Sequence, residues 1–213
     1  MPFGVLLISF RQDLDPMNDS TARFSKTASG KVSKDKWLEV GLAVLSEIGA
    51  NGLTIERLCA MTERSKGSFY FHFSSIEVYK LDLLSYWEGK ATVETENGVV
   101  AHDDPIDQRL AMPRLAAALS NRVEVAIRAW SHHDAKAKAE IRKVDARRIA
   151  FVAGVIAQTD GVPLEIAQRL ATIEYAAFLG FQHLLDDASQ SERQNMYEST
   201  LFLISPHLRR PGE

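Results

Sequence analysis

Apolar residues recur at three- and four-residue intervals along most of this chain, and that period restricts its fold more than any other feature. The first clear stripe has the spacing of an amphipathic helix. It consists of Trp37, Val40, Gly41, Val44, Leu45 and Ile48. A polar loop, TENGVVAHDDP, is expected beyond residue 90. Later helical patterns are expected near 106–120, 122–133, 135–159, 163–186 and 191–205. Because no segment alternates steadily between apolar and polar residues, we predict an all-α fold with short helices first and long helices behind.

The charge of the chain is unevenly distributed. Over all 213 residues the formal net charge is only -3, so the whole molecule is not an obvious binder of polyanions. Between Ser20 and Ser75, however, basic residues outnumber acidic ones, and the remainder is acidic. A basic segment on an acidic protein favours a nucleic-acid-binding end joined to another module.

The cysteine content and the N-terminal segment indicate where the protein works. Cys59 is the one cysteine, which excludes a disulfide within the chain and fits a reducing, cytoplasmic setting. The apolar run FGVLLISF is short and has no basic residues before it, so we expect neither a signal peptide nor a membrane span. Residues 1–32 show little periodicity and are expected to form a flexible arm, with Met17 as an alternative first residue.

The segment 53–73 has the spacing of two short helices joined by a tight turn. Thr54 can cap the first helix and Ser65 the second. The second helix contains SFYFHF, whose aromatic residues taken alone would favour a strand. On a helix, Phe69 and Phe73 share one inner face. We therefore predict a helix-turn-helix, whose second helix enters the DNA major groove with its N-terminus first.

The stretch GLTIERLCAMTERSKGSFYFHFSS resembles the DNA-binding signature of the TetR family of bacterial transcriptional repressors. Its specific marks are the Leu-Thr entry, the Ser-Lys-Gly start of the next helix, the Phe-Tyr pair, His-Phe and the closing Ser-Ser. The resemblance implies a three-helix helix-turn-helix DNA-binding domain at 33–80. It also implies a helical ligand-binding, regulatory and dimerisation domain at 81–213.

The resemblance further implies that five residues of the second helix face DNA: Lys66, Gly67, Ser68, Tyr70 and His72. Each suits that position chemically. Lys66 can reach a guanine edge or a phosphate, and Gly67 lets the backbone approach closely. Ser68, Tyr70 and His72 can all donate hydrogen bonds to phosphate oxygens.

Three positions depart from the usual TetR pattern. Glu63 stands where the family has glycine, so a left-handed conformation there would carry about 1–2 kcal/mol of strain. Arg64 follows it in place of an apolar residue and is available to a phosphate. Ile76 replaces a common basic contact, and we expect basic residues of the N-terminal arm to compensate from the adjacent groove. These are Arg23, Lys26, Lys31 and Lys34.

Two further residues of this module complete the expectations. Thr54 can hold a phosphate through its hydroxyl or through the N-terminus of its helix. Phe71 is either a core residue or a wedge on the surface, and we favour the core.

The pattern at 163–186 is apolar almost all round, as in a helix buried on several sides. The resemblance implies that this helix and the last one pair with their copies in a four-helix homodimer interface; the alternative is a purely intramolecular core. On the last helix, Tyr197, Thr200, Leu201 and Ile204 share a face.

The resemblance also implies a small-molecule pocket in the rear half of the chain. Its candidate lining residues are Trp87, Met112, Trp130, Phe151, Tyr175 and Phe178. Glu174, Gln182 and His183 are polar residues embedded in the apolar helix, and pockets combine apolar walls with a few polar groups. For each candidate, an ordinary core position is an equally good interpretation.

We therefore expect a ligand-responsive regulator, most simply a homodimeric repressor that a small molecule releases from a pseudo-palindromic operator in double-stranded DNA. An all-α carrier or enzyme with a degenerate helix-turn-helix, and an architectural DNA binder, are the alternatives. No zinc-type spacing, Walker loop, G-x-S-x-G or Rossmann fingerprint occurs, so we expect no catalysis, cofactor or metal. In the stretch SHHD, the residues His132, His133 and Asp134 are expected to cap a helix end in solvent.

Overall fold

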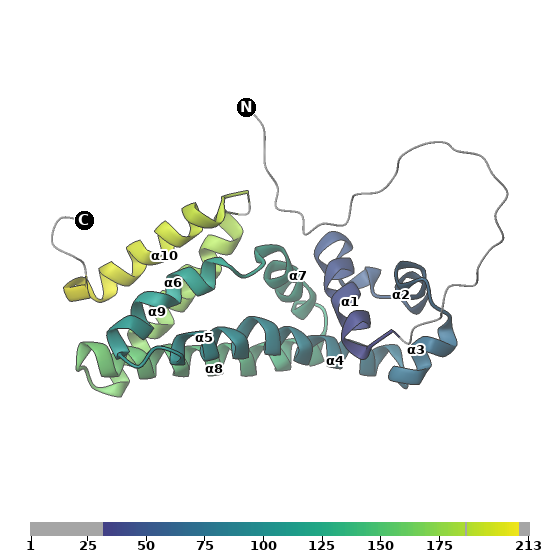
Figure 1. Cartoon of the computed structure of the whole chain (residues 1–213), viewed down its shortest axis with the longest axis horizontal. Coiled ribbons are helices and arrows are strands. Elements are labelled where there is room, and N and C mark those ends of the chain that lie inside the picture. Colours follow the sequence, from purple (N-terminus) through teal and green to yellow (C-terminus); the bar gives the residue numbers. More distant parts are fainter. Residues whose placement is uncertain (1–31, 186, 209–213) are drawn as a thin grey trace, which may run out of the picture. The chain divides into compact units, whose positions relative to one another are not determined.

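The computed structural model describes residues 32–185 and 187–208 (Figure 1). All regular elements in these ranges are helical, as predicted. The expectations for Arg23, Lys26 and Lys31 of the N-terminal arm, and for the alternative start at Met17, fall on residues outside the described ranges. Lys34 does not belong to a flexible arm: it is the first residue of a helix, and its ammonium nitrogen lies 2.8 Å from a carboxylate oxygen of Asp82.

Four short helices form the front of the described chain, and each begins at a serine or threonine. The hydroxyl oxygens of these N-caps accept a hydrogen bond from the backbone N–H three residues further on, which satisfies an otherwise unpaired donor of the first turn. The N-caps are Ser33, Thr54, Ser65 and Ser75. The helices are α1 (Lys34–Ile48), α2 (Ile55–Thr62), α3 (Lys66–His72) and α4 (Ile76–Glu88), with a 3₁₀ turn at Ala50–Gly52 between α1 and α2.

A cluster of aromatic rings holds α1, α3 and α4 together. Phe69 lies 5.6 Å from the ring of Trp37, 5.2 Å from that of Phe73 and 5.5 Å from that of Tyr79, measured between centroids. All four side chains are buried. The Tyr79 hydroxyl donates to the carbonyl of Trp37 at 2.8 Å, which satisfies the one polar atom of that ring. The helical reading of SFYFHF is confirmed.

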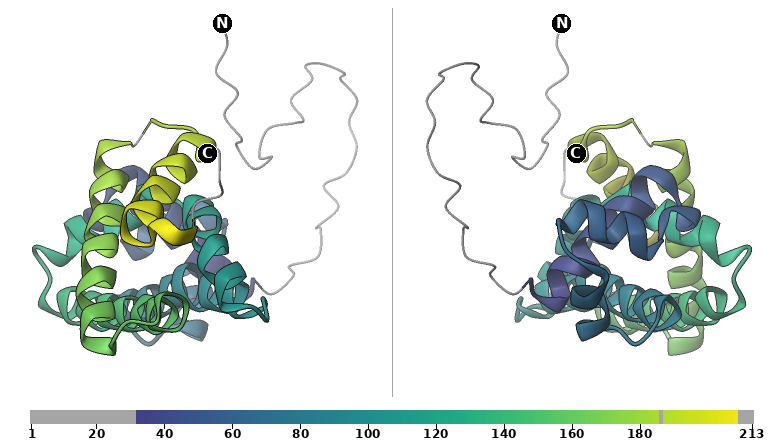
Figure 2. Two further views of the ribbon diagram at one scale, coloured as in Figure 1. Left: turned by 90° about the vertical axis from the view of Figure 1, so that its left-hand side faces the viewer. Right: turned by 90° about the vertical axis from the view of Figure 1, so that its right-hand side faces the viewer.

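Five further helices follow at positions close to those predicted. They are α6 (Pro105–Ala117), α7 (Asn121–Ser131), α8 (Ala135–Asp160), α9 (Leu164–Leu184) and α10 (Gln190–Ile204), with a closing 3₁₀ turn at Pro206–Leu208. Helix α9 packs along α8, and α10 packs against α6 and α9. Figure 2 shows α9 and α10 as neighbours at the end of the described chain away from α2 and α3.

The polar stretch after residue 94 is helical, whereas the sequence predicted a loop there. Helix α4 runs without a break through a π-helical turn at Gly89–Val93 into α5 (Glu94–Val100). Val99 is fully buried, and a Cβ on Gly98 would lie 3.2 Å from Leu115 of α6. Close packing of α5 on α6 therefore overrides the low helix propensity of asparagine and glycine in this stretch.

The front helices also contact the rear ones. Helix α1 packs against α7, and α4 packs against α8. The predicted division between a DNA-binding and a regulatory domain after residue 80 falls inside α4, and it stays a prediction.

Candidate functional site

The turn between α2 and α3 depends on one residue with positive φ. Glu63 has φ 54° and ψ 42° and caps α2, so the left-handed conformation considered from the sequence is confirmed. The N–H of Arg64 donates to the carbonyl of Cys59 at 2.9 Å, which closes the end of α2. This reversal brings the N-terminus of α3 to the surface directly after α2.

Helix α3 buries one side and exposes the other. Phe69 and Phe73 are in the core, as predicted, while Tyr70 keeps 53% of its surface exposed. Phe71 is 63% exposed, so its predicted core position is wrong. Two residues correspond to about 200° around a helix, so Phe71 points away once Phe69 and Phe73 occupy the inner stripe.

The other residues expected at the DNA lie around this exposed side. Lys66 and Gly67 are exposed, Ser68 is half-buried, and Thr54 is exposed at the start of α2. Arg64 is half-buried, and one of its guanidinium nitrogens donates to the Glu63 carbonyl at 3.1 Å. Their contacts with DNA remain predictions.

Glu56 is a neighbour of Lys66 that sequence reasoning missed. Its carboxylate lies 2.5 Å from the Lys66 ammonium nitrogen and links α2 to α3. The hydrogen bond and the opposite charge lower the pKa of Glu56 and raise that of Lys66. The ten-residue separation gave no helical-spacing signal, because the pair forms only when the turn folds back.

His72 has a contact inside the chain as well. Its Nε2 lies 2.9 Å from the carbonyl oxygen of Val32, just before the N-cap of α1. If Nε2 carries the proton in the neutral ring, Nδ1 is an acceptor. The predicted donation from His72 to a phosphate therefore competes with this internal hydrogen bond.

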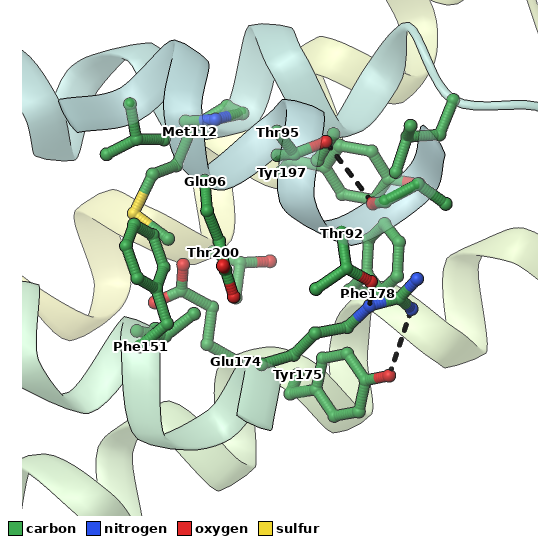
Figure 3. A pocket seen from close by; sticks show the side chains of 17 residues that line it. Thr92, Thr95, Glu96, Met112, Phe151, Glu174, Tyr175, Phe178, Tyr197 and Thr200 are labelled. Atoms are coloured by element: carbon green, nitrogen blue, oxygen red, sulfur yellow. Dashed lines mark hydrogen bonds between the residues drawn. The ribbon is translucent and has the colours of Figure 1, made fainter. Parts of the chain in front are cut away.

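A cavity of about 110 Å³ lies among the rear helices (Figure 3). That volume is many times the roughly 10–15 Å³ that one water needs, so a small organic molecule fits. Its wall includes four of the predicted residues: Met112, Phe151, Tyr175 and Phe178. Further lining residues are Ala91, Thr92, Thr95, Glu96, Val99, Pro113, Ala116, Leu119, Arg148, Val152, Glu174, Tyr197 and Thr200.

Trp87 and Trp130 are not among these lining residues, which corrects the sequence-based list. Both are buried in the core formed with α1, and the indole N–H of Trp130 donates to Asp134 at 3.2 Å. Trp87 lies one layer behind the wall, because its ring faces the Arg148 guanidinium at 5.0 Å. An aromatic residue at helical spacing can lie either in the cavity wall or in the core behind it, and the sequence alone does not distinguish these two positions.

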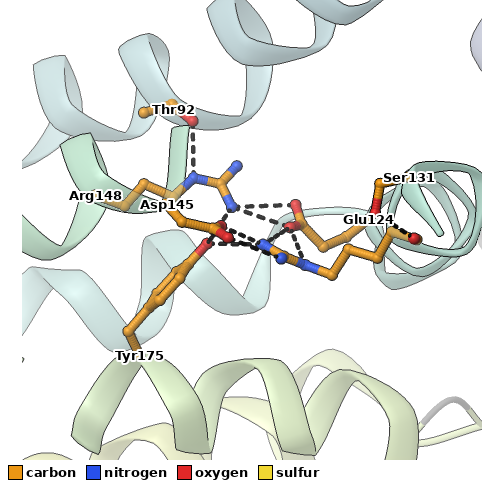
Figure 4. Close-up of polar contacts among 7 residues, drawn as sticks. Thr92, Glu124, Ser131, Asp145, Arg148 and Tyr175 are labelled. Carbon is orange, nitrogen blue, oxygen red and sulfur yellow. Dashed lines mark hydrogen bonds and ion pairs between the residues drawn. The ribbon is translucent and has the colours of Figure 1, made fainter. Parts of the chain in front are cut away.

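Behind the cavity, two arginines and two carboxylates form a partly buried network around the Tyr175 hydroxyl (Figure 4). Arg148 donates to Glu124, and Arg128 donates to Glu124 and Asp145. Burial lowers the pKa of Arg148, but Glu124 and Tyr175 outweigh this effect and hold it above its ordinary value. Burial raises the pKa of Tyr175 well above its usual range.

Glu174, predicted as an embedded polar group, forms a second pair with Arg109. The Nη1 and Nη2 atoms of Arg109 donate to the two carboxylate oxygens of Glu174 at 2.7 and 2.5 Å, and the arginine is fully buried. Gln182 is buried and His183 is exposed. The sequence did hold a signal for the arginines: Arg148 falls on the inward stripe of α8 together with Ile141 and Val144.

The apolar face named for α10 lies inside the chain. Tyr197 and Leu201 are buried, so the part of α10 open to a second copy is the opposite face. The SHHD expectation is confirmed: His132 caps the end of α7, His133 is exposed, and Asp134 caps the start of α8.

In the described ranges, no group of three or more His, Cys, Asp or Glu side chains could hold a metal ion. None of the described helices combines the length and apolar character needed to cross a membrane.

Comparison with known proteins identifies the fold. No protein-family model matches the sequence, and no curated protein matches it. Among solved structures, a TetR-family regulator from Bordetella parapertussis 12822 superposes with a TM-score of 0.62 at 17% identity, covering 80% of this chain and 93% of that one. The chain has the TetR fold.

Two further solved structures are similar to this chain. A transcriptional regulator from Rhodococcus sp. Rha1 has a TM-score of 0.70 at 15% identity, covering 84% of this chain and 100% of that one. A protein from Saccharomonospora viridis, described as a transcriptional regulator and in complex with choline, has a TM-score of 0.67 at 16% identity, covering 80% and 94%.

Proposed function

We propose that this protein is a ligand-responsive, DNA-binding transcriptional regulator of the TetR type. In its simplest form it is a cytoplasmic homodimeric repressor that a small molecule releases from a pseudo-palindromic operator. The observation that carries the proposal is the division of α3: Phe69 and Phe73 are buried, while Lys66, Gly67 and Tyr70 are exposed beside the helix-turn-helix.

Gly67 supports the DNA-facing role of this surface. A Cβ at Gly67 would meet only the Ser65 hydroxyl, at 3.7 Å, and the residue has no positive φ. Nothing in the described fold therefore requires glycine there. A backbone that must approach DNA closely does give a reason for it.

A dimer supplies the second reading head. Helix α9 exposes Ile173, Ala176 and Leu184, which lie on one face at i, i+3 and i+11, and Ile173 is 60% exposed. Helix α10 exposes Met196 and Leu203, the latter at 79%. Exposed apolar faces on two adjacent helices favour association, and two heads would read half-sites about 34 Å apart, one helical turn of DNA.

The proposed coupling runs through α4. This helix leaves the helix-turn-helix and continues through the π-helical turn at Gly89–Val93, where Ala91 and Thr92 line the cavity. Single π-helical turns are frequent at functional sites. A ligand that prefers one position of this turn would shift the population of head spacings, by no more than its differential affinity for the two states.

The test is selection of bound DNA from a random pool, followed by anisotropy titrations at several salt concentrations. We expect a palindrome, bound at least about a thousandfold more tightly than random DNA. Tyr70→Ala should weaken operator binding about tenfold or more, whereas Lys138→Ala, an exposed change on α8, should not. Equal affinity for all sequences would favour an architectural binder, and no binding at all would favour a carrier or enzyme.

A further inference from the structure

Two residues that line the cavity each carry a buried hydrogen-bonding atom with no partner among the described residues. These atoms are the Nη2 of Arg148, from α8, and the hydroxyl of Tyr197, from α10. The two side chains are only 8% and 6% exposed. Because a buried polar group without a partner is costly, such groups are rare in folded proteins. Two of them at one cavity need an explanation.

Arg148 is fixed in place on every other side. Its Nε donates to Thr92 at 2.8 Å, and its Nη1 donates to Glu124 at 3.1 and 3.2 Å and to the Tyr175 hydroxyl at 3.2 Å. The ring of Trp87 lies 5.0 Å from the centre of the guanidinium. Figure 4 shows these bonds on two of the three nitrogens, with the third left free. The guanidinium is therefore preorganised to donate from Nη2.

Tyr197 is held by rings rather than by hydrogen bonds. Its centroid lies 5.4 Å from that of Phe178 and 6.0 Å from that of Phe181. Burial raises the pKa of its hydroxyl to about 12, so the group stays protonated and can donate at neutral pH. Figure 3 shows Tyr197 and Phe178 together in the cavity wall.

The carboxylates in the wall are already neutralised. Both oxygens of Glu174 accept from Arg109, and both oxygens of Glu96 accept from Arg147 at 2.6 to 3.1 Å. A cationic ligand would therefore find no uncompensated negative charge. The rest of the wall is mainly aliphatic and aromatic, with Met112, Phe151 and Phe178 as its largest apolar members.

We propose that the cavity binds an apolar organic molecule carrying an acceptor oxygen, a carbonyl or a carboxylate, which accepts hydrogen bonds from Arg148 Nη2 and the Tyr197 hydroxyl. The proposal rests on the proposed function in that this molecule is the effector. A ligand held in this way links α8 to α10. Arg148 is hydrogen-bonded to Thr92, so the ligand would also affect the position of the π-helical turn.

The experiment is calorimetric titration of the full chain, without DNA, with four probes of similar size. Acetophenone offers a neutral acceptor, benzoate an anionic one, isopropylbenzene none, and benzyltrimethylammonium is a cation. We expect acetophenone or benzoate to bind about tenfold to a hundredfold more tightly than isopropylbenzene, the factor that matches a hydrogen bond to a charged donor. The stronger of the two identifies the class of acceptor.

Tyr197→Phe makes the test specific, because it removes only an atom with no partner and leaves the ring contacts. It should weaken binding of the acceptor probe at least about threefold and leave isopropylbenzene unchanged. Tyr86→Phe, outside the cavity wall, is the matched control. Arg148→Lys, checked for folding by circular dichroism, should reduce the preference for the acceptor probe further.

Equal affinities for the acceptor probes and isopropylbenzene, tightest binding of the cation, no saturable binding of any probe, or an unchanged affinity in Tyr197→Phe would each overturn the proposal. These results are separable from failure of the proposed function. If the DNA selection still yields a palindrome, the proposed function as a regulator is kept and only the proposed class of ligand is rejected.

Discussion

At the scale of single residues, Gly41 has a role that helix propensity would not suggest. It lies within α1, where alanine would ordinarily be better by about 1 kcal/mol. A Cβ there, however, would lie 1.9 Å from the Tyr79 hydroxyl oxygen and 2.9 Å from its ring. We predict that Gly41→Ala destabilises the protein by about 2 kcal/mol, because Tyr79 must move and lose its bond to Trp37. Urea unfolding measures the change.

Gly154 is the matched control for Gly41. It lies inside α8, and a Cβ on it would have nothing within 4 Å. Gly154→Ala should therefore stabilise the protein by up to about 1 kcal/mol. A Gly41→Ala protein as stable as the Gly154→Ala protein would show that Tyr79 does not need the space.

Glu63 is a second residue whose backbone decides its effect. At φ 54° the backbone of any residue with a Cβ is strained, whereas that of a glycine is not. We predict that Glu63→Gly is more stable than Glu63→Ala by about 1 kcal/mol, since both lack the carboxylate and only alanine keeps the strain. Equal midpoints of urea unfolding for the two variants would contradict this.

At the scale of elements, α8 depends on its N-cap. Asp134 accepts from the backbone N–H groups of Lys136 and Ala137, at 2.9 and 3.0 Å. Asp134→Ala should destabilise the protein by about 1–2 kcal/mol, whereas Asp134→Asn, an equally good cap, should lose less. Urea unfolding at pH 7 checks both values.

The pH dependence of this cap has a defined sign. The backbone N–H of Ala137 lowers the pKa of Asp134 in the folded protein. Its charge-dependent contribution is therefore complete above the unfolded value near 4 and is lost as the pH falls through the lower folded value. The stability difference between wild type and Asp134→Asn should shrink from pH 6 to pH 3; a difference that stays constant would count against a role for the charge.

The helices that could be predicted are those whose signals are local. Caps such as Thr54 and Ser65 and the apolar stripe of α1 appear directly in the sequence, because they depend on residues within one or two turns. Helix α5 was missed because its stability comes from Gly98 and Val99 packing on α6, which is distant in sequence. Local propensity carries no information about that contact.

The same distinction applies to the candidate sites. The buried positions of Phe69 and Phe73 follow from helical spacing. The exposure of Phe71 could not be predicted in the same way, because it depends on how much of the surface of this seven-residue helix the rest of the fold covers. Apolar residues of the cavity wall, such as Phe151, could be predicted from the sequence as candidates, because they lie at helical spacing. Arg109, 65 residues from its partner Glu174, was not, because an ion pair between helices depends on tertiary packing.

At the scale of the whole molecule, we expect the proposed regulator to act as a dimer, because one seven-residue reading helix contacts too few bases. The faces available for this are those that α9 and α10 leave exposed, with Ile173 and Leu203 as their large apolar members. A charge introduced there would be buried without a partner on association, which costs several kcal/mol. We predict that Leu203→Glu is monomeric by light scattering and binds a palindromic operator at least about tenfold more weakly.

The control for this prediction is Val100→Glu, an equally simple change at an exposed apolar residue of α5. It should leave the mass of the dimer and operator binding unchanged. Within one protomer the side chain of Leu203 is 79% exposed. Its substitution should therefore not lower the stability of the isolated protomer. If Leu203→Glu stays dimeric while Val100→Glu dissociates, association uses α5, and the second reading head must be positioned from that side.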